Sequence, residues 1–269
     1  MIALLLAAAP ALAAEPETPG YGSETDPPSP VSPPESAAGQ KPSKKFSARF
    51  RSDFYSRYLW NGVPFSKGAV WQPSASVEFH GVGLSVWSNF VLDDEPNQGE
   101  FNEVDLSLYY RRSFGRWDLQ ASIIGLIYFN DDPASLNRGP NGLQAYFQVG
   151  RRLGPVKIFS DLTVGLLEPA GSVFWDLGVL YHKDLPLHFG LETSALFGLG
   201  DARFNRAYIA DVGTQANLLV FSLAFPWNPL KGISFIPSVT VSNLLAPSLR
   251  RASPDPTVVW GGLSFVFDY

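Results

Sequence analysis

The chain has 269 residues, of which 45% are hydrophobic, 14% aromatic and 17% charged, and it contains no cysteine. The lack of cysteine excludes disulfide scaffolds, thiol catalysis and cysteine-ligated metal sites. A formal net charge of -5 argues against a nucleic-acid partner, because nucleic-acid binders normally carry a basic patch. Mean hydropathy is only +0.02 despite 20 Phe, 10 Tyr and 7 Trp, which indicates that apolar residues are interleaved with polar ones.

Two segments precede the part of the chain that is expected to fold. Residues 1–13 form a short apolar run that closes in Ala-Leu-Ala, which is typical of a secretory signal peptide cleaved after Ala13. Residues 14–45 contain eight prolines among Ser, Glu and Gly. Such a segment buries too little apolar surface to offset its ordering entropy, so we expect a disordered Pro/Ser/Glu-rich tether.

From Phe46 onward apolar and polar residues alternate, as they do in a strand with two different faces. In 102–112, for example, Leu106 and Leu108 share one face while Glu103 and Asp105 share the other. A tilted strand needs about 9–11 residues to cross a bilayer, and the predicted segments reach that length. The predicted strands are 46–58, 69–80, 82–93, 102–112, 117–129, 142–152, 156–167, 172–183, 187–197, 208–225, 233–243 and 257–269.

The connections between these segments alternate in length. They are short after the even-numbered strands, as at 113–116, and mostly longer after the odd-numbered ones, as at 130–141. Short periplasmic turns and longer outer loops are typical of bacterial outer-membrane barrels, which also have an even number of strands. We therefore predict that 46–269 forms an all-β, transmembrane, antiparallel up-and-down barrel of about 12 strands with both termini in the periplasm.

Three local features qualify this pattern. The alternation is lost between Gln215 and Leu219, which predicts either a β-bulge or a wrong boundary for the tenth strand. Pro237 lies inside a predicted strand, where it removes one backbone donor. Trp60 and Trp71 near one end, and Trp117 and Trp227 near the other, are interpreted as aromatic girdles at the two membrane interfaces.

The last predicted strand runs to the final residue and ends on an aromatic side chain. It resembles the C-terminal strand of bacterial outer-membrane barrels. This resemblance implies that Phe265, Phe267 and Tyr269 form a signal read by the barrel-assembly machinery.

The first predicted strand carries a second resemblance. Ser52-Asp53 is followed by aromatic residues, by Arg57 and by Gly62, and this opening resembles Gcw_chp, a proteobacterial outer-membrane family of unknown function. In that family an Arg usually precedes the Gly directly, whereas Asn61 stands there in this chain. The resemblance implies an outer-membrane barrel and supplies no catalytic residues.

If the apolar faces contact lipid, the opposite faces line a lumen, since charges on the lipid face are costly. A lumen of mixed charge with many small polar residues predicts a passive channel for small hydrophilic solutes. The predicted lumen-lining residues are Arg49, Arg51, Asp53, Arg57, Glu78, Glu103, Asp105, Arg111, Asp118, Lys157, Asp161, Asp176 and Glu192.

Two other function classes compete with a channel. The first is a closed structural or adhesive barrel whose interior is filled by salt bridges, because 12 strands lie between filled and open barrels. The second is a lipid-modifying enzyme with a Ser-His-acid arrangement. The three histidines, His80, His182 and His188, all fall at predicted periplasmic strand ends, away from the outer leaflet, and no HExxH, P-loop or GxSxG string occurs. His182 and His188 flank one predicted hairpin, where a weak metal site is the alternative to rim histidines in polar surroundings. We therefore expect no enzyme, no cofactor and no metal.

The predicted outer loops carry acids at Asp93, Asp94, Glu95, Asp131 and Asp132. These acids are interpreted either as solvated charge or as ligands for divalent cations beside lipopolysaccharide. The expected partners are outer-membrane lipids and lipopolysaccharide, the assembly machinery and small hydrophilic solutes.

Overall fold

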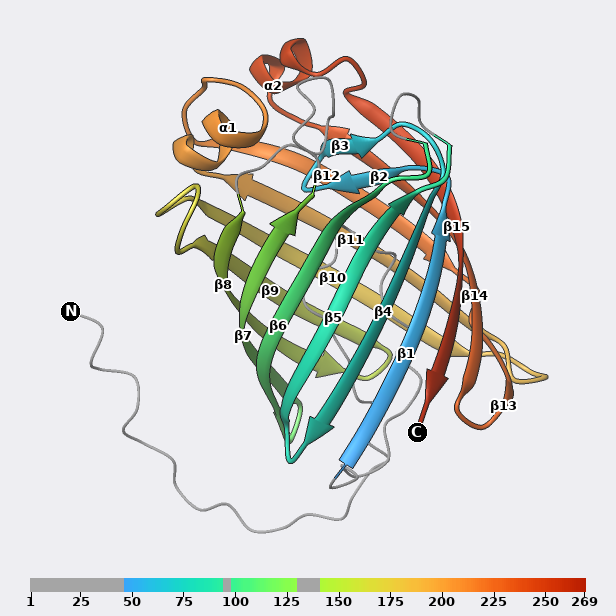
Figure 1. Cartoon of the computed structure of the whole chain (residues 1–269). Helices are drawn as coiled ribbons and strands as arrows, with labels where there is room; N and C mark the ends of the chain where they lie inside the picture. Colours follow the sequence, from blue (N-terminus) through green and yellow to red (C-terminus); the bar gives the residue numbers. More distant parts are fainter. Residues whose placement is uncertain (1–45, 94–97, 130–140) are drawn as a thin grey trace, which may run out of the picture.

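The computed structural model describes residues 46–93, 98–129 and 141–269. The dominant feature is a ring of 12 long antiparallel strands (Figure 1). These strands are β1 (Phe46–Tyr55), β4 (Val70–Phe79), β5 (Val82–Val91), β6 (Phe101–Phe114), β7 (Trp117–Tyr128), β8 (Gly142–Leu153), β9 (Val156–Gly165), β10 (Val173–Asp184), β11 (Gly190–Gly200), β12 (Gln215–Ala224), β14 (Ile233–Leu244) and β15 (Thr257–Asp268). Five smaller elements are β2 (Tyr58–Trp60), β3 (Val63–Ser66), β13 (Trp227–Leu230), α1 (Ala202–Tyr208) and α2 (Pro247–Ala252).

The ring closes without a free edge. Each long strand pairs with its neighbour in sequence order, and the first pairs with the last, Phe54 of β1 lying opposite Leu263 of β15. Closure gives every long strand a hydrogen-bonded neighbour on both sides, which a bilayer requires because it offers no water to unpaired backbone groups. The predicted all-β, 12-stranded antiparallel barrel is confirmed.

The two ends of the barrel differ (Figure 1). β1 starts and β15 finishes at one end, which we call the terminus end, and the turns there are tight, as at His80–Gly81 and Gly115–Arg116. The other end, which we call the helix end, carries α1, α2 and the β2–β3 hairpin. In the described part of the chain no helix is both long and apolar enough to cross a membrane.

Alternation along the strands separates an apolar outer face from a polar inner one. Leu84, Leu108 and Val149 are among many large apolar side chains exposed on the outside. Ser107 of β6 and Gln120 of β7 are, by contrast, buried inside the barrel. Exposed apolar surface on this scale far exceeds the patches of soluble monomers, so the outer face is built to contact lipid.

Some predicted boundaries shift for local reasons. The tenth predicted strand, 208–225, begins only at Gln215, because Asp201 caps α1 by accepting from the Phe204 backbone N–H at 2.7 Å. The predicted bulge is confirmed, since Leu199 pairs with Ala216 while Gly198 pairs with Leu218, which leaves one extra residue in β12.

Pro237 keeps its place within β14 and lies opposite Leu263 of β15. Its side chain is exposed on the lipid face, and its carbonyl accepts from the Phe225 backbone N–H at 3.0 Å. The strand thus retains a ladder bond on the acceptor side and loses only the donor that proline lacks.

The girdle interpretation is wrong for one tryptophan. Trp117 and Trp227 are exposed on the outside, 41% and 39%, and Trp71 is partly exposed there. Trp60, by contrast, is buried and contacts Phe65 at a ring-centroid distance of 5.8 Å. It lies in the inward-folded β2–β3 hairpin instead of in the barrel wall, so it cannot reach the membrane interface.

Two adjacent glycines at the closing seam offer a stability test. A Cβ added at inward-facing Gly262 would lie 2.1 Å from the Tyr55 ring and 2.7 Å from the Phe54 carbonyl oxygen, whereas at outward-facing Gly261 its nearest neighbour is 3.4 Å away. We expect Gly262→Ala to lower the free energy of unfolding by about 1–3 kcal/mol through overpacking. Gly261→Ala should change it by less than about 0.5 kcal/mol. Urea unfolding in lipid vesicles measures the free energy of unfolding of each variant. Equal losses in the two variants would contradict the close packing of Tyr55 against Gly262.

Candidate functional site

The inward face of the wall carries the charged side chains that alternation assigned to a lumen. Their positions follow from strand parity, and most are buried or half-buried. The residues on this face are Arg49, Arg51, Asp53, Glu78, Glu103, Asp105, Arg111, Asp118, Lys157, Asp161, Asp176 and Glu192. Arg57 differs, because β1 ends at Tyr55 and Arg57 lies in the following turn, 3.4 Å from Asp255.

Near the terminus end, inward cations meet carboxylates of nearby strands. The Arg49 Nε donates to Asp268 at 2.6 Å, and Lys157 lies 3.8 Å from Asp118. In the same region Arg111 pairs with Glu78, and Arg152 pairs with Asp118. Sequence reasoning missed Asp268 and Arg152, although both lie on the inward parity of their strands and that parity identifies them.

Further along β1 toward the helix end, Arg51 and Asp53 form an ion pair. The Arg51 Nε lies 2.8 Å from both carboxylate oxygens of Asp53, and each side chain is only 4% exposed. Arg51 also donates to Ser264 at 3.1 Å. Burying a charged pair is tolerated when hydrogen bonds satisfy its remaining polar atoms, as they do here.

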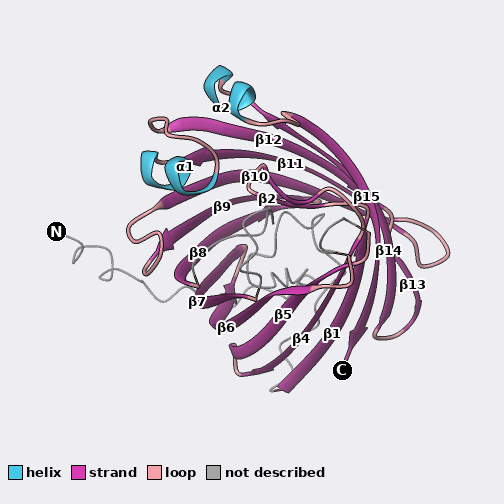
Figure 2. Ribbon diagram, turned by 45° about the horizontal axis from the view of Figure 1, so that its top comes forward, coloured by secondary structure: helices cyan, strands magenta, loops and turns pink. Residues whose placement is uncertain are grey.

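The β2–β3 hairpin folds into the helix end of the barrel. Asn61 and Gly62 have φ values of 48° and 81°, which suit a two-residue turn between antiparallel strands. The tip of the hairpin points at the inner wall, since a Cβ at Gly62 would lie 2.9 Å from Leu244 of β14. Figure 2 shows the hairpin within the ring of strands.

Aromatic side chains fill the space between the hairpin, α1 and the wall. Trp60 packs against Tyr208 of α1 at 4.8 Å and against Phe204 at 5.5 Å, and Tyr58 stacks on Phe65 at 5.2 Å. We call this group the mouth cluster. Its buried members are Tyr55, Tyr58, Leu59, Trp60, Phe65, Val70, Trp87, Phe174, Phe204, Leu218, Val220, Leu244, Ala246, Leu249, Val258 and Trp260.

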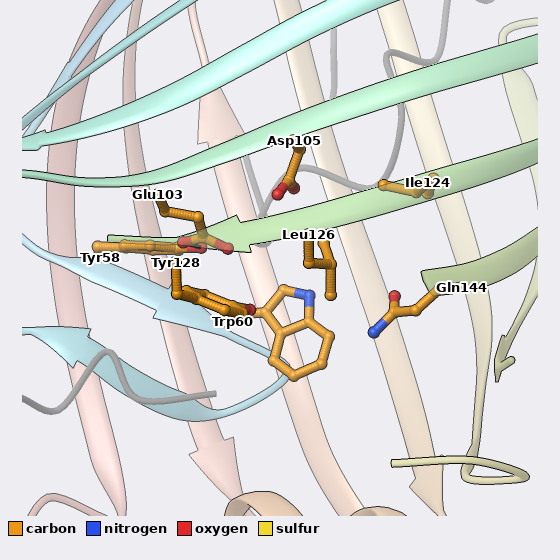
Figure 3. A pocket seen from close by; sticks show the side chains of 8 residues that line it. All are labelled: Tyr58, Trp60, Glu103, Asp105, Ile124, Leu126, Tyr128 and Gln144. Carbon is orange, nitrogen blue, oxygen red and sulfur yellow. Dashed lines mark hydrogen bonds between the residues drawn. The ribbon is translucent and has the colours of Figure 1, made fainter. Parts of the chain in front are cut away.

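One side of the hairpin faces acids on β6. The Tyr58 hydroxyl donates to Glu103 at 2.8 Å, and Asp105 lies two residues along the same inward face. Between them and β7–β8 lies a partly enclosed cavity of about 10 Å³, large enough for one water-sized particle (Figure 3). Its lining is Tyr58, Trp60, Glu103, Asp105, Ile124, Leu126, Tyr128 and Gln144.

Tyr208 of α1 covers the same region. Burial raises the pKa of Tyr208 to about 12, and the Glu103 carboxylate adds to the increase. The phenol therefore stays protonated at neutral pH and interacts with Gln144 as a hydrogen-bonding group.

A second pair of acids lies on β9 and β10. Asp161 and Asp176 are directly opposite one another in the register, beside Tyr146 and Gln148 of β8. The Gln148 side-chain amide donates to the Tyr146 hydroxyl at 2.9 Å. The structure thus brings together two carboxylates that sequence reasoning had placed on one face but had not paired.

The histidines lie at the terminus end. His182 directs Nδ1 to Glu192 at 3.0 Å and Nε2 to Asp184 at 3.1 Å, so carboxylates hold both of its ring nitrogens. His188 lies in the turn before β11 with a φ of 64°. No group of three or more metal-ligating histidines or acids occurs among the residues that the structure describes.

The C-terminal aromatics occupy the outer face. Phe265 and Phe267 point outward from β15 at the seam, and Tyr269, 77% exposed, follows the end of the strand. Their role in assembly stays a prediction. The expected signal peptide 1–13, the tether 14–45 and the loop acids Asp94, Glu95, Asp131 and Asp132 lie outside the described residues.

Comparison with known proteins supports the fold. No family model matches the chain, and no curated protein matches it either. The solved KdgM porin matches with a TM-score of 0.50 at 8% identity, covering 83% of this chain and 99% of the porin. A structure of KdgM porin in complex with disordered oligogalacturonate matches with the same score and coverage at 9% identity.

Other outer-membrane barrels match less closely. NanC porin has a TM-score of 0.48 at 10% identity, covering 82% of this chain and 98% of the porin. Outer membrane phospholipase A from Escherichia coli has a TM-score of 0.45 at 12% identity, covering 82% of this chain and 92% of the enzyme. The match to the KdgM porin, at 8% identity, shows a shared porin-like barrel fold alone.

Proposed function

We propose that the chain is an outer-membrane channel that passively passes small hydrophilic solutes. The observation that carries this proposal is the inward wall of β6–β8, which lies opposite much of the mouth cluster in the ring and carries five neutral polar side chains, interrupted by the apolar group of Tyr146, Ile124 and Leu126. From the terminus end toward the helix end this wall presents Gln148, Gln120, Ser122, Ser107 and Gln144. Small and neutral polar side chains of this kind support a hydrated path beside the hairpin.

The orientation follows from the barrel type. The terminus end with its tight turns faces the periplasm in this proposal, and the helix end faces outward. The signal peptide 1–13 directs export, the segment 14–45 acts as a periplasmic tether, and lipopolysaccharide contacts the outer leaflet part of the wall. Membership of Gcw_chp stays a prediction, since its basis is the opening strand alone.

The solved KdgM complex holds oligogalacturonate. For the present chain that complex supports only the general class of solute, a small hydrophilic molecule. The fold likeness at 8% identity supports the channel class and no particular substrate.

Planar bilayers provide the direct test. The refolded chain, checked by its shift in gel mobility on boiling, is expected to give discrete conductance steps. Protein boiled before insertion is the control, and it should give none. Properly folded protein that never produces steps, at any applied voltage, would rule out the channel.

The second candidate is a closed structural or adhesive barrel anchored through the tether. The mouth cluster favours it, because 16 buried apolar side chains occupy the helix end. It predicts that deleting 14–45 reduces cell-wall association while solute uptake by intact cells stays unchanged. If cells that lack the protein take up less solute than cells that express the wild-type chain, the result would instead favour transport.

A further inference from the structure

The strongest unexplained group inside the barrel is Asp105. Its side chain is only 5% exposed, and its Oδ1 has no hydrogen-bond partner in the structure. Trp87 lies directly opposite Asp105 in the β5–β6 register, yet its indole N–H also finds no acceptor there. No ion pair between described residues includes Asp105, so an ionised Asp105 would lack the compensation that a buried carboxylate requires unless a cation binds beside it.

The free lone pairs of Asp105 point into the cavity shown in Figure 3. Glu103, 2% exposed, lies on the same inward face and borders the same cavity. Gln144 and the phenols of Tyr58 and Tyr128 add neutral oxygens, while Ile124, Leu126 and Trp60 close the remaining sides. The cavity is therefore small and partly enclosed, with oxygen atoms that can coordinate a cation on one side and apolar groups on the other.

We propose that Glu103 and Asp105 bind a small hard cation, best matched by Ca²⁺. Two carboxylates balance a divalent charge, and calcium accepts carboxylate, amide and hydroxyl oxygens in flexible geometry. The set contains no sulfur or imidazole, so it does not suit zinc or copper. A volume of about 10 Å³ admits a single ion and excludes an organic solute. The site is separate from conduction and exists whether or not the barrel passes solutes.

Terbium luminescence tests this proposal directly, because Tb³⁺ replaces Ca²⁺ at oxygen sites and Trp60, Tyr58 and Tyr128 line the cavity as energy donors. The whole folded chain in detergent micelles is titrated with Tb³⁺ under tryptophan excitation. We expect saturable sensitised emission that Ca²⁺ displaces. Asp105→Asn should weaken the apparent affinity at least tenfold, and the Glu103→Gln, Asp105→Asn double variant should abolish the signal.

Two matched controls separate this site from other acids. Asp211→Asn removes one exposed carboxylate at the helix end and should leave the titration unchanged. The Asp131→Asn, Asp132→Asn pair removes two acids that the sequence assigns to a predicted outer loop, and it should also leave the titration unchanged. Gel mobility before and after boiling verifies folding, and Glu103→Gln alone serves if Asp105→Asn does not fold.

Three outcomes would overturn the site. Absence of saturable emission from the folded wild-type chain excludes a bound ion at this site. An unchanged affinity in both Glu103→Gln and Asp105→Asn excludes these carboxylates as ligands. Loss of the signal in the Asp131→Asn, Asp132→Asn variant assigns the ion to those two acids instead. Each result is independent of whether conductance steps are seen.

Discussion

Removing the β2–β3 hairpin is expected to raise the single-channel conductance several-fold. The variant replaces Tyr58–Ser66 by a Gly-Ser pair, and the ends still meet because Tyr55 and Val70 are paired across β1 and β4. The hairpin brings Tyr58, Trp60 and Phe65 into the mouth cluster, so its loss widens the path that ions follow at the helix end. Single-channel recording in planar bilayers gives the comparison with the wild-type chain.

A smaller change provides the control for this result. Trp60→Ala keeps the hairpin and removes one ring from its contacts with Tyr208 and Phe204, so it should give a lesser increase. Equal conductance of the wild-type and hairpin-deleted barrels, both folded, would show that the hairpin lies outside the conducting path. If neither conducts, the closed structural barrel is the better description.

Placing arginine at the middle of the lipid face is expected to destabilise the barrel strongly. Leu108 lies near the centre of β6, points outward and is 53% exposed. Leu108→Arg should lower the free energy of unfolding in lipid vesicles by about 2–4 kcal/mol, because the charge must enter the hydrocarbon core. Urea titration with the wild-type chain as reference measures the loss.

The matched control uses the same strand and the same face. Phe114 ends β6 at the terminus end, points outward and is 50% exposed. Because this position is near the membrane interface, Phe114→Arg should cost about 0–1 kcal/mol. Similar losses at both positions would argue against a depth-dependent membrane environment for this face.

Much of the barrel is predictable from local alternation. The period of two assigns Leu108 to one face and Asp105 to the other without knowledge of any partner strand. The extra residue in β12 also shows itself locally, as the loss of parity between Gln215 and Leu219. Boundaries were less predictable, because α1 replaces the expected start of the tenth strand through the Asp201 cap.

The direction of the β2–β3 hairpin was not predictable in this way. Asn61-Gly62 is a recognisable turn signal, yet nothing in those two residues tells whether the hairpin extends outward or folds inward. The distinction depends on contacts with residues far along the chain, such as Leu244 and Phe204. Trp60 was therefore assigned to the wrong environment.

The sequence by itself determined the strand number and the separation of an apolar outer face from a polar inner face, because each depends on spacing within a strand or between neighbours. Only the tertiary structure decided which inward groups meet. The pairing of Arg49 with Asp268, the opposition of Asp161 and Asp176, and the cavity beside Asp105 all depend on register, on closure and on the inserted hairpin. The near-zero mean hydropathy of the chain gives no hint of these contacts. They join residues that are far apart in sequence and meet only because the ring closes, so no local pattern marks them.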